Sequence, residues 1–212
     1  MSSKVATSDF EVVDFALIKH EKIRLRPMYY ELGFSNTPTI YGRKAIFNRL
    51  LHALSFIPNH YGFLIWDIYR PREVQGRLFE WMRDEIKKNQ PALSNDENYA
   101  EAKKYMSPPS KVGEVYCPPH LSGGAIDLTL FECSSGKEIN MGTKFDDCTE
   151  KAHRDYFESA SRLSPNEENI RTNRNILRHA MESAGFTTYK YEWWHYDFGD
   201  SFWGNETGQN AI

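Results

Sequence analysis

The sequence predicts an α+β fold, in which a small, mostly antiparallel sheet carries several packed helices. Apolar residues recur at helical spacing in some stretches, and shorter stretches rich in β-branched and aromatic residues lie between them. The stretches with helical spacing are residues 43–56, 73–88 and 165–184. The strand-like stretches are residues 61–69, 124–130 and 186–198. We expect the functional site to lie in a cleft over this sheet.

Length and composition describe an ordinary globular chain. With 212 residues, of which 40% are hydrophobic and 26% charged, the chain is expected to form a single domain over residues 1–212. A net charge of −3 gives no basis for binding nucleic acid or an anionic membrane surface. No apolar stretch approaches the roughly 18 residues of a membrane span. We therefore expect no nucleic-acid or membrane partner, and we leave the formation of a homo-oligomer open.

The cysteines and the first residues indicate a cytoplasmic protein. Cys117, Cys133 and Cys148 are odd in number and form no Cys-x-x-Cys pair, which argues against a disulfide framework. Residues 1–9 contain no apolar run of signal-peptide length. Both observations favour a reducing compartment, and we expect a cytoplasmic protein.

The first part of the chain is expected to hold an arm, a helix and a strand. Residues 9–32 alternate loosely between apolar and charged side chains, which predicts a short strand or extended arm. Residues 43–56 read as an amphipathic helix, and residues 61–69 as a buried strand. This strand ends at Arg70-Pro71, because proline cannot continue the pairing.

A long helix and a short one follow this strand. Residues 73–88 place apolar side chains on one face, which is expected to pack into the core, and Pro91 ends the helix. That face comprises Val74, Leu78, Trp81, Met82 and Ile86. Ser94, with Glu97 three residues later, is a capping signal for a short helix that reaches about residue 105. Prolines between residues 107 and 119 predict a rigid, extended loop that borders the functional site.

Residues 124–130 read as a strand with an unusual polar face. Alternation places aliphatic side chains on one face and small or polar ones on the other, namely Ala125, Asp127 and Thr129. A carboxylate in an apolar strand is costly unless it is paired, hydrogen-bonded or bound to a metal. Glycines at positions 123 and 124 let the backbone bend, so that His120 can fold back towards Asp127.

Two irregular segments are expected after this strand. Residues 134–136 mark a hairpin turn, and residues 141–147 mark a loop. The simplest interpretation of Asp146 and Asp147 is a solvated turn, or a cap for the segment over residues 149–159.

The last part of the chain is expected to contain a helix, a hairpin and a loose tail. Ser164 and Glu167 form a capping signal for a helix that Gly185 closes. Residues 186–198 alternate and are rich in aromatic residues, which predicts a strand or hairpin. The tail from Gly199 contains glycine and asparagine and is expected to be poorly ordered or loosely packed.

Four side chains suggest a catalytic zinc centre. Catalytic zinc usually takes three protein ligands and leaves a fourth position for water, and His120, Asp127 and His195 are a normal ligand set. Bound zinc lowers the pKa of its water to around 7. A nearby carboxylate can take the proton of that water and later give it to a leaving amine. We therefore hypothesise one zinc ion per chain, with Glu192 as the base that activates the zinc-bound water.

The spacing of Glu192 and His195 predicts a bend. On a straight strand, these two side chains would point to opposite faces. Both can serve one metal ion only if the chain bends between them, or if Glu192 lies in a loop before the strand. We predict that bend.

Together these motifs resemble a known family. His-x-x-Gly-x-Ala-x-Asp at residues 120–127, followed by Glu-x-Trp-His at residues 192–195, is similar to the zinc D-alanyl-D-alanine peptidases. Within them it resembles the D-Ala-D-Ala dipeptidases of the vancomycin-resistance type. Three further stretches agree in the same order, at residues 69–71, 141–146 and 184–186. The resemblance runs from about residue 62 to residue 198 and implies a hedgehog/D-Ala-D-Ala-peptidase-like fold.

The resemblance implies a role for each site residue. It implies zinc ligands at His120, Asp127 and His195, a catalytic base at Glu192, an oxyanion-stabilising cation at Arg70 and a binding group for the free amine of the dipeptide at Asp146. One position departs from the family, which usually has serine two residues before the first histidine. Here the residue is Pro118, which has no N–H to donate, so recognition of the substrate carboxylate must differ.

Simpler interpretations exist for several of these residues. Arg70 could be a surface residue at a strand end, and its neighbour Arg72 is expected to be solvated or salt-bridged. Cys117 could be a zinc ligand or a thiol nucleophile with His195 as base. We favour neither, because Asp127 completes the ligand set and no cysteine-peptidase signature is present. The remaining histidines lack metal-type partners at useful spacing, namely His20, His52, His60, His153 and His179.

The function predicted from this reasoning is a zinc metallopeptidase that hydrolyses D-Ala-D-Ala or closely related small dipeptides. The nearest alternative is a D,D-carboxypeptidase or endolysin-like peptidase that acts on longer cell-wall peptides. A further alternative is a non-catalytic zinc-bound module, against which Arg70 and Glu192 argue, because a structural zinc needs neither. A sugar-binding wall module would require a repeat, which the sequence lacks.

Overall fold

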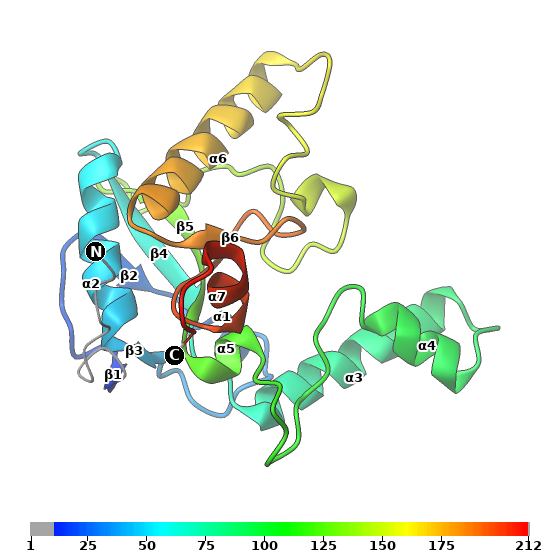
Figure 1. Cartoon of the computed structure of the whole chain (residues 1–212). Helices are drawn as coiled ribbons and strands as arrows, with labels where there is room; N and C mark the ends of the chain where they lie inside the picture. Colours follow the sequence, from blue (N-terminus) through cyan, green and yellow to red (C-terminus); the bar gives the residue numbers. More distant parts are fainter. Residues whose placement is uncertain (1–10, 212) are drawn as a thin grey trace.

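The computed structural model describes residues 11–211 and has the predicted α+β architecture (Figure 1). Its centre is a 5-stranded sheet. In spatial order, the strands are β2 (Ile23–Leu25), β4 (Tyr61–Asp67), β5 (Ala125–Glu132), β7 (His195–Asp197) and β6 (Thr187–Thr188). Only β2 and β4 pair in parallel, and the other neighbours are antiparallel, so the prediction of a mostly antiparallel sheet is confirmed. A separate antiparallel pair joins β1 (Val12–Asp14) to β3 (Tyr41–Arg43).

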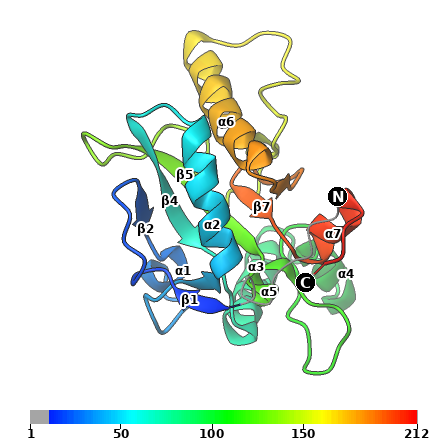
Figure 2. The ribbon, with the colours of Figure 1, turned by 60° about the vertical axis from the view of Figure 1, so that its left-hand side comes forward.

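Two helices cover one face of the sheet and form the main core with it. They are α2 (Lys44–Ala53), which continues into the 3-10 turn η2 (Leu54–Phe56), and α6 (Pro165–Ser183) (Figure 2). Ile46 and Leu50 of α2 and Leu177 of α6 are fully buried in the same cluster as the sheet residues Ile126 and Leu128. Removing this much apolar surface from water is the main stabilising contribution to the fold.

A second, smaller core lies beside the sheet. The helices α3 (Arg72–Asn89) and α4 (Asn95–Ala102) pack together there, and α1 (Met28–Glu31) contributes Tyr29. Leu78 and Met82 are buried as predicted, but Trp81 is not a core residue, because 37% of its surface is exposed. Trp81 instead contacts the ring of Phe34 edge-on, at 5.9 Å between ring centroids.

A tight turn delivers His120 to the sheet. Pro119 begins the short helix α5 (Pro119–Ser122), which Gly123 ends in the left-handed region with a φ of 72°. At Gly124, a Cβ atom would lie 2.8 Å from the carbonyl oxygen of Phe198, so only glycine lets β5 start this close to the strand beside it. The bend expected at these glycines is therefore present, and it sets His120 beside Asp127.

The prediction of a loose tail after Gly199 is wrong. Residues 201–207 form the helix α7 (Ser201–Thr207), and the carboxylate of Asp200 caps it by accepting from the backbone N–H of Trp203 at 2.9 Å. The Trp203 side chain is buried against Phe198, and its Nε1 donates to the carbonyl oxygen of Gly185 at 2.9 Å. The apolar area of one tryptophan, together with a cap, outweighs the glycine and asparagine around it.

The segment after the 141–147 loop is also less regular than a capped helix. It contains only the 3-10 turn η3 (Glu150–Ala152) and further turns. Asp147 still caps its start, because its Oδ1 accepts from the backbone N–H of Thr149 at 2.8 Å. Among residues 11–211, no helix is long and apolar enough to cross a membrane. The expectation that no leader occupies residues 1–9 concerns residues outside the described range.

Candidate metal centre

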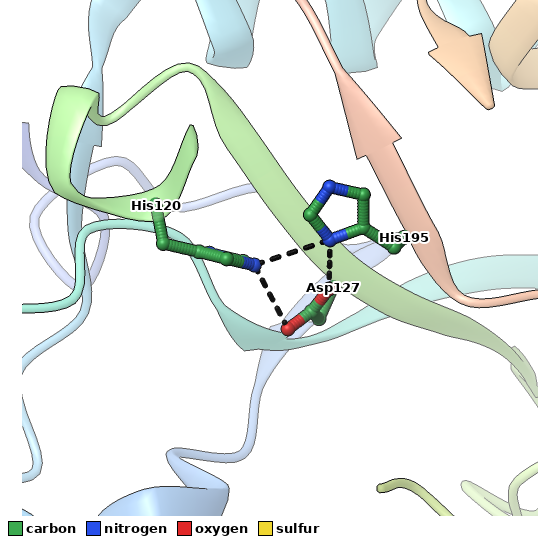
Figure 3. Close-up of side chains that lie close together, drawn as sticks. All are labelled: His120, Asp127 and His195. Atoms are coloured by element: carbon green, nitrogen blue, oxygen red, sulfur yellow. Dashed lines mark hydrogen bonds and ion pairs between the residues drawn. The ribbon is translucent and has the colours of Figure 1, made fainter. Parts of the chain in front are cut away.

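Three buried side chains meet where β7 begins, close to the start of β5 (Figure 3). His120 comes from α5, Asp127 from β5 and His195 from β7, and the register of the sheet pairs Asp127 directly with His195. The Nε2 atom of His120 lies 3.2 Å from Asp127 Oδ2 and 3.2 Å from Nδ1 of His195. The same Nδ1 lies 3.1 Å from Asp127 Oδ1.

These distances fit a tetrahedral metal ion. Zinc takes nitrogen and carboxylate oxygen ligands at about 2.1 Å, which places neighbouring ligand atoms of a tetrahedron about 3.4 Å apart. In the part of the chain that the structure describes, His120, Asp127 and His195 are the one group of such side chains whose ligand atoms lie within 4.8 Å of one another. The donor set therefore suits zinc, and the remaining histidines form no comparable group among the described residues.

The second nitrogen of each imidazole is held by a neighbour outside the centre. His120 Nδ1 lies 2.8 Å from the carbonyl oxygen of Ile68, which can only accept, so Nδ1 donates there, and in the neutral imidazole Nε2 keeps its lone pair. His195 Nε2 lies 2.9 Å from Asp197 Oδ1. When Nε2 donates to this carboxylate, Nδ1 keeps its lone pair for a metal. Both inward-facing nitrogens are thus the ones that can coordinate.

The centre is electrostatically prepared for a cation. Burial by itself raises the pKa of Asp127, but His120 and His195 outweigh it and hold the pKa of this carboxyl well below its usual range. Burial lowers the pKa of His195, whereas Asp197 and Asp127 outweigh burial and raise it well above its usual range. The carboxylates on both sides of His195 therefore favour positive charge here, whether from a proton or from a metal ion.

Glu192 lies in the loop just before β7, as the predicted bend requires. Its Oε2 is 3.8 Å from Nδ1 of His195, the nitrogen that faces the centre. Burial is the main cause that raises the pKa of Glu192, to about 8, and the carboxylates of Asp127 and Asp146 add to the shift. A divalent cation in the centre would act in the opposite direction, because positive charge favours the ionised carboxylate.

Arg70 is buried, so its interpretation as a surface residue is wrong. Its Nε donates to Asp67 at 2.9 Å, and its two terminal nitrogens donate to Gln75 at 3.0 Å and to Asp127 at 3.2 Å. The guanidinium also lies over the ring of Tyr29, 4.5 Å from the ring centroid. Burial lowers the pKa of Arg70, but the surrounding anionic groups outweigh it, so Arg70 keeps its charge. Arg72 is exposed, as expected.

Asp146 lies in the 141–147 loop with a φ of 57°, and no other non-glycine residue among residues 11–211 has a positive φ. Its Oδ1 accepts from the Tyr29 hydroxyl at 3.3 Å. Burial raises the pKa of Asp146 to about 7, although the nearby Arg70 acts to lower it. Asp147, not Asp146, caps the turn by accepting from the backbone N–H of Thr149. The Asp146 carboxyl lines the cavity.

All the site residues predicted from the sequence line one cavity of about 100 Å³, namely Arg70, His120, Asp127, Asp146, Glu192 and His195. Pro118 and Ser107 line it too, as expected for the proline-rich loop. Cys117 is exposed and lies outside this lining, so nothing in its position supports a thiol nucleophile.

Several residues of this site escaped the sequence reasoning. Asp197 could have been found, because positions 195 and 197 of one strand share a face. Tyr29, Asp67 and Gln75 gave no such signal, because only the folded chain brings them to Arg70. Gln75 also ties the proline-rich loop to the centre, since its Nε2 donates to the carbonyl oxygen of Ser107 at 2.6 Å.

Comparison with known proteins identifies relatives of this chain. Residues 35–209 match the family model of the M15 peptidases, described as D-ala-D-ala dipeptidase. A D-alanyl-D-alanine dipeptidase of Enterococcus faecium is 34% identical over 143 residues, which are 66% of this chain and 63% of that protein. One from Enterococcus faecalis (strain ATCC 700802 / V583) is 32% identical over the same shares. The chain thus matches somewhat less than two thirds of the length of these relatives.

Solved structures give a weaker likeness. A structure of VanYB in complex with D-Alanine-D-Alanine has a TM-score of 0.46 at 15% identity and covers 81% of each chain. The family model matches most of the chain, and the M15 family is zinc-dependent. The donor set of His120, Asp127 and His195 accordingly fits the zinc cofactor of that family. The chain belongs to the M15 peptidase family, whose family model is described as D-ala-D-ala dipeptidase.

Proposed function

We propose that the chain is a zinc metallopeptidase that hydrolyses D-Ala-D-Ala or closely related small dipeptides. The observation that carries this proposal is the convergence of base, cation and ligand candidates on one cavity, although they lie far apart in the sequence. The cavity, at about 100 Å³, is smaller than the roughly 300–1,000 Å³ of sites for drug-sized ligands. That size favours a small substrate.

His120, Asp127 and His195 are the proposed zinc ligands, through His120 Nε2, His195 Nδ1 and the Asp127 carboxylate. When bound there, zinc supplies a Lewis acid that polarises the peptide carbonyl and acidifies a water molecule. The chain itself supplies the orientation of both imidazoles, because Ile68 and Asp197 fix their outer nitrogens.

Glu192 is the proposed general base. It takes a proton from the attacking water while the water oxygen forms a bond to the carbonyl carbon of the scissile peptide. The carbon–nitrogen bond then breaks, and Glu192 returns that proton to the leaving amine. The products are the two free amino acids, so no further reactant is needed.

Arg70 and Asp146 are proposed to hold the two charged parts of the reacting substrate. The Arg70 guanidinium lines the cavity beside Asp127 and would stabilise the negative charge that develops on the carbonyl oxygen. The Asp146 carboxylate would bind the free ammonium group of the dipeptide, in a charge-assisted hydrogen bond. Tyr29 orients Asp146 through its hydroxyl.

The test of this function is D-alanine release from D-Ala-D-Ala by the purified, zinc-loaded protein. Glu192→Ala is expected to lower kcat by at least about 10²-fold while zinc content stays unchanged, because Glu192 moves the proton but is not a ligand. Glu158→Ala, which removes an exposed carboxylate away from the cavity, is the matched control and should keep full activity. Wild-type protein that binds zinc but releases no D-alanine would refute the substrate assignment, and full activity of Glu192→Ala would refute the base assignment.

N-acylation of the substrate separates a dipeptidase from a peptidase that acts on longer cell-wall peptides. An acetyl group on D-Ala-D-Ala removes the ammonium charge that Asp146 is proposed to bind. The acetylated dipeptide should therefore be a poor substrate for the wild-type protein. Faster hydrolysis of the acetylated form than of the free dipeptide would favour the carboxypeptidase alternative.

We also propose that the protein acts in the cytoplasm. Cys117, Cys133 and Cys148 are all free thiols in the structure. Free thiols persist in a reducing compartment such as the cytoplasm. The proposed substrate there is a small dipeptide. Cell fractionation with an antibody to the chain tests this, and recovery in the extracellular fraction would contradict it.

A further inference from the structure

A second and larger cavity adjoins the catalytic one. Its volume is about 400 Å³, against about 100 Å³ for the catalytic cavity. Asp146, Glu192 and Tyr189 line both, so the two spaces meet beside the proposed base and the proposed amine-binding group. We call the larger space the side cavity. Residues that line it but not the catalytic cavity include Trp81, Met82, His153, Tyr191 and Trp194.

The residues that line the side cavity come from α3, the segment after α4 and the loops that follow β5 and β6; these elements can be followed in Figure 1. Aromatic side chains form part of its walls, namely Trp81, Tyr105, Tyr189, Tyr191 and Trp194. Trp81 and Tyr191 keep 37% and 43% of their surfaces exposed, although both are large and mainly apolar. Tyr191 is braced by edge-on contacts with His153, at 5.1 Å, and with Tyr189, at 5.5 Å between ring centroids. A braced aromatic wall with open faces is suited to receive another ring.

Charged groups on these walls are largely engaged with their own neighbours. Lys104 Nζ lies 2.6 Å from the carboxylate of Glu101. Asp147 Oδ1 accepts from the backbone N–H of Thr149 at 2.8 Å. Lys103 also lines both cavities, and its side chain is exposed to solvent. Besides these charged groups, the side cavity offers aromatic side chains and the thioethers of Met82 and Met106.

The side cavity lies beside the expected position of the amino-terminal residue of the dipeptide. In the proposed function, Asp146 binds the ammonium group and Glu192 serves the scissile carbonyl. Both groups belong to the amino-terminal residue of the substrate, and both side chains border the side cavity. The side chain of that residue therefore has the side cavity next to it. A methyl group would leave nearly all of this space to water.

Resting on the proposed function, we propose that the side cavity binds the side chain of the amino-terminal residue of the dipeptide, and that this side chain is aromatic. The substrate class is then D,D-dipeptides with a large aromatic amino-terminal residue and a carboxyl-terminal D-alanine. Burial of a ring against Trp81 and Tyr191 removes apolar surface of both partners from water. The reaction remains the same peptide hydrolysis.

A panel of dipeptides tests this specificity with the zinc-loaded full chain. D-Phe-D-Ala is expected to show a kcat/KM about tenfold above that of D-Ala-D-Ala, the gain typical of filling a hydrophobic pocket. D-Ala-D-Phe carries the same ring at the other end and should show no such gain. Slower hydrolysis of D-Phe-D-Ala than of D-Ala-D-Ala would overturn the proposal, as would an equal gain for D-Ala-D-Phe. Preference for D-Glu-D-Ala over D-Phe-D-Ala would overturn the aromatic assignment.

A pair of variants links the preference to the side cavity. Trp81→Ala removes one aromatic wall and should reduce the ratio of the D-Phe-D-Ala and D-Ala-D-Ala kcat/KM values by about fivefold or more. Tyr99→Ala is the matched control, because Tyr99 is 41% exposed on the neighbouring helix α4 and lines neither cavity. The control should keep the wild-type ratio. An unchanged ratio in a folded Trp81→Ala protein would mean that the aromatic ring of the substrate does not bind in the side cavity.

Binding to an inactive variant separates this proposal from the catalytic one. Zinc-loaded Glu192→Gln keeps a side chain of the same shape but cannot act as a base. By calorimetry it should bind D-Phe-D-Ala about tenfold more tightly than D-Ala-D-Ala. This result would support the side cavity even if the wild-type protein hydrolysed neither peptide, in which case the catalytic proposal alone would fail. Equal or weaker binding of D-Phe-D-Ala would overturn the role of the side cavity.

Discussion

At the scale of single residues, the metal centre owes its geometry to groups that never face the metal. Ile68 and Asp197 hold the outer nitrogens of His120 and His195, and each imidazole is thereby left with one inward lone pair. Arg70 holds Asp127 from the other side. The ligands are thus oriented by the protein itself, before any cation is considered.

Arg70 carries a residue-scale prediction about catalysis. Arg70→Lys keeps the positive charge but loses the planar group that donates to Asp67, Gln75 and Asp127 together. We expect kcat for D-Ala-D-Ala to fall by about 10²–10³-fold, the usual loss when a donor to a developing oxyanion is removed. Steady-state kinetics on zinc-loaded protein measures this.

The neighbouring arginine supplies the control for that experiment. Arg72 is exposed, so Arg72→Lys should leave kcat unchanged. Circular dichroism must show that Arg70→Lys is folded, because a buried ion pair has been altered. A folded Arg70→Lys protein with wild-type kcat would remove Arg70 from the oxyanion role.

At the scale of elements, the sequence predicts best where a local chemical signal marks an end. Ser164 and Glu167 form the predicted capping box at the start of α6, and Ser94 and Glu97 form another at α4. The signal for α7 was also local, since Asp200 precedes it as a cap. The composition of the tail nevertheless predicts disorder, because glycine and asparagine are frequent in it and the burial of Trp203 is visible only in the folded chain.

The helix α7 gives an element-scale prediction about stability. Trp203→Ala should lower the free energy of unfolding by about 3–5 kcal/mol, because it empties a buried site and removes the bond to Gly185. Phe202→Ala on the same helix should cost less than about 1 kcal/mol, because Phe202 is 42% exposed. Urea denaturation of both variants measures the difference. Equal losses would mean that α7 does not hold the core through Trp203.

The sequence predicts less of the site's outer contacts than of its ligands. His120, Asp127, Glu192 and His195 lie in motifs whose spacing can be read directly. Gln75 sits in a helix whose pattern indicates only packing, and its link to Arg70 arises from how α3 docks after the strand turn. Such contacts depend on the relative placement of elements, which a single sequence does not contain.

At the scale of the whole molecule, the three proposed zinc ligands join elements that the chain order keeps apart. α5, β5 and β7 meet only when the sheet has formed, so the folded state holds a site that the unfolded chain lacks. A ligand that binds only the folded state stabilises it by mass action. That the chain is a single domain over residues 1–212 stays a prediction, and the same experiment addresses it.

Thermal unfolding with and without chelator tests both points. Zinc at about 100 times its Kd should add about 2.7 kcal/mol to the free energy of unfolding, which corresponds to a rise in Tm of roughly 5–10 °C. His120→Ala should abolish this rise. A single domain should unfold in one transition in calorimetry. Two separated transitions would mean that the chain contains more than one domain. A zinc effect that survives in His120→Ala would mean that zinc binds at another site.

The left-handed backbone at Asp146 limits how this position can evolve. Few residues other than glycine accept such a conformation, and asparagine and aspartate are the most tolerant among them. Apart from a change to glycine, Asp146→Asn is therefore the substitution that this backbone accepts most readily. It needs a single-base change, preserves the loop and removes the negative charge. If Asp146 binds the ammonium group as proposed, a descendant carrying that change would bind free amino termini more weakly without losing its fold. Exchange of one carboxylate for an amide would then shift the preferred substrate from free dipeptides to peptides with blocked amino termini.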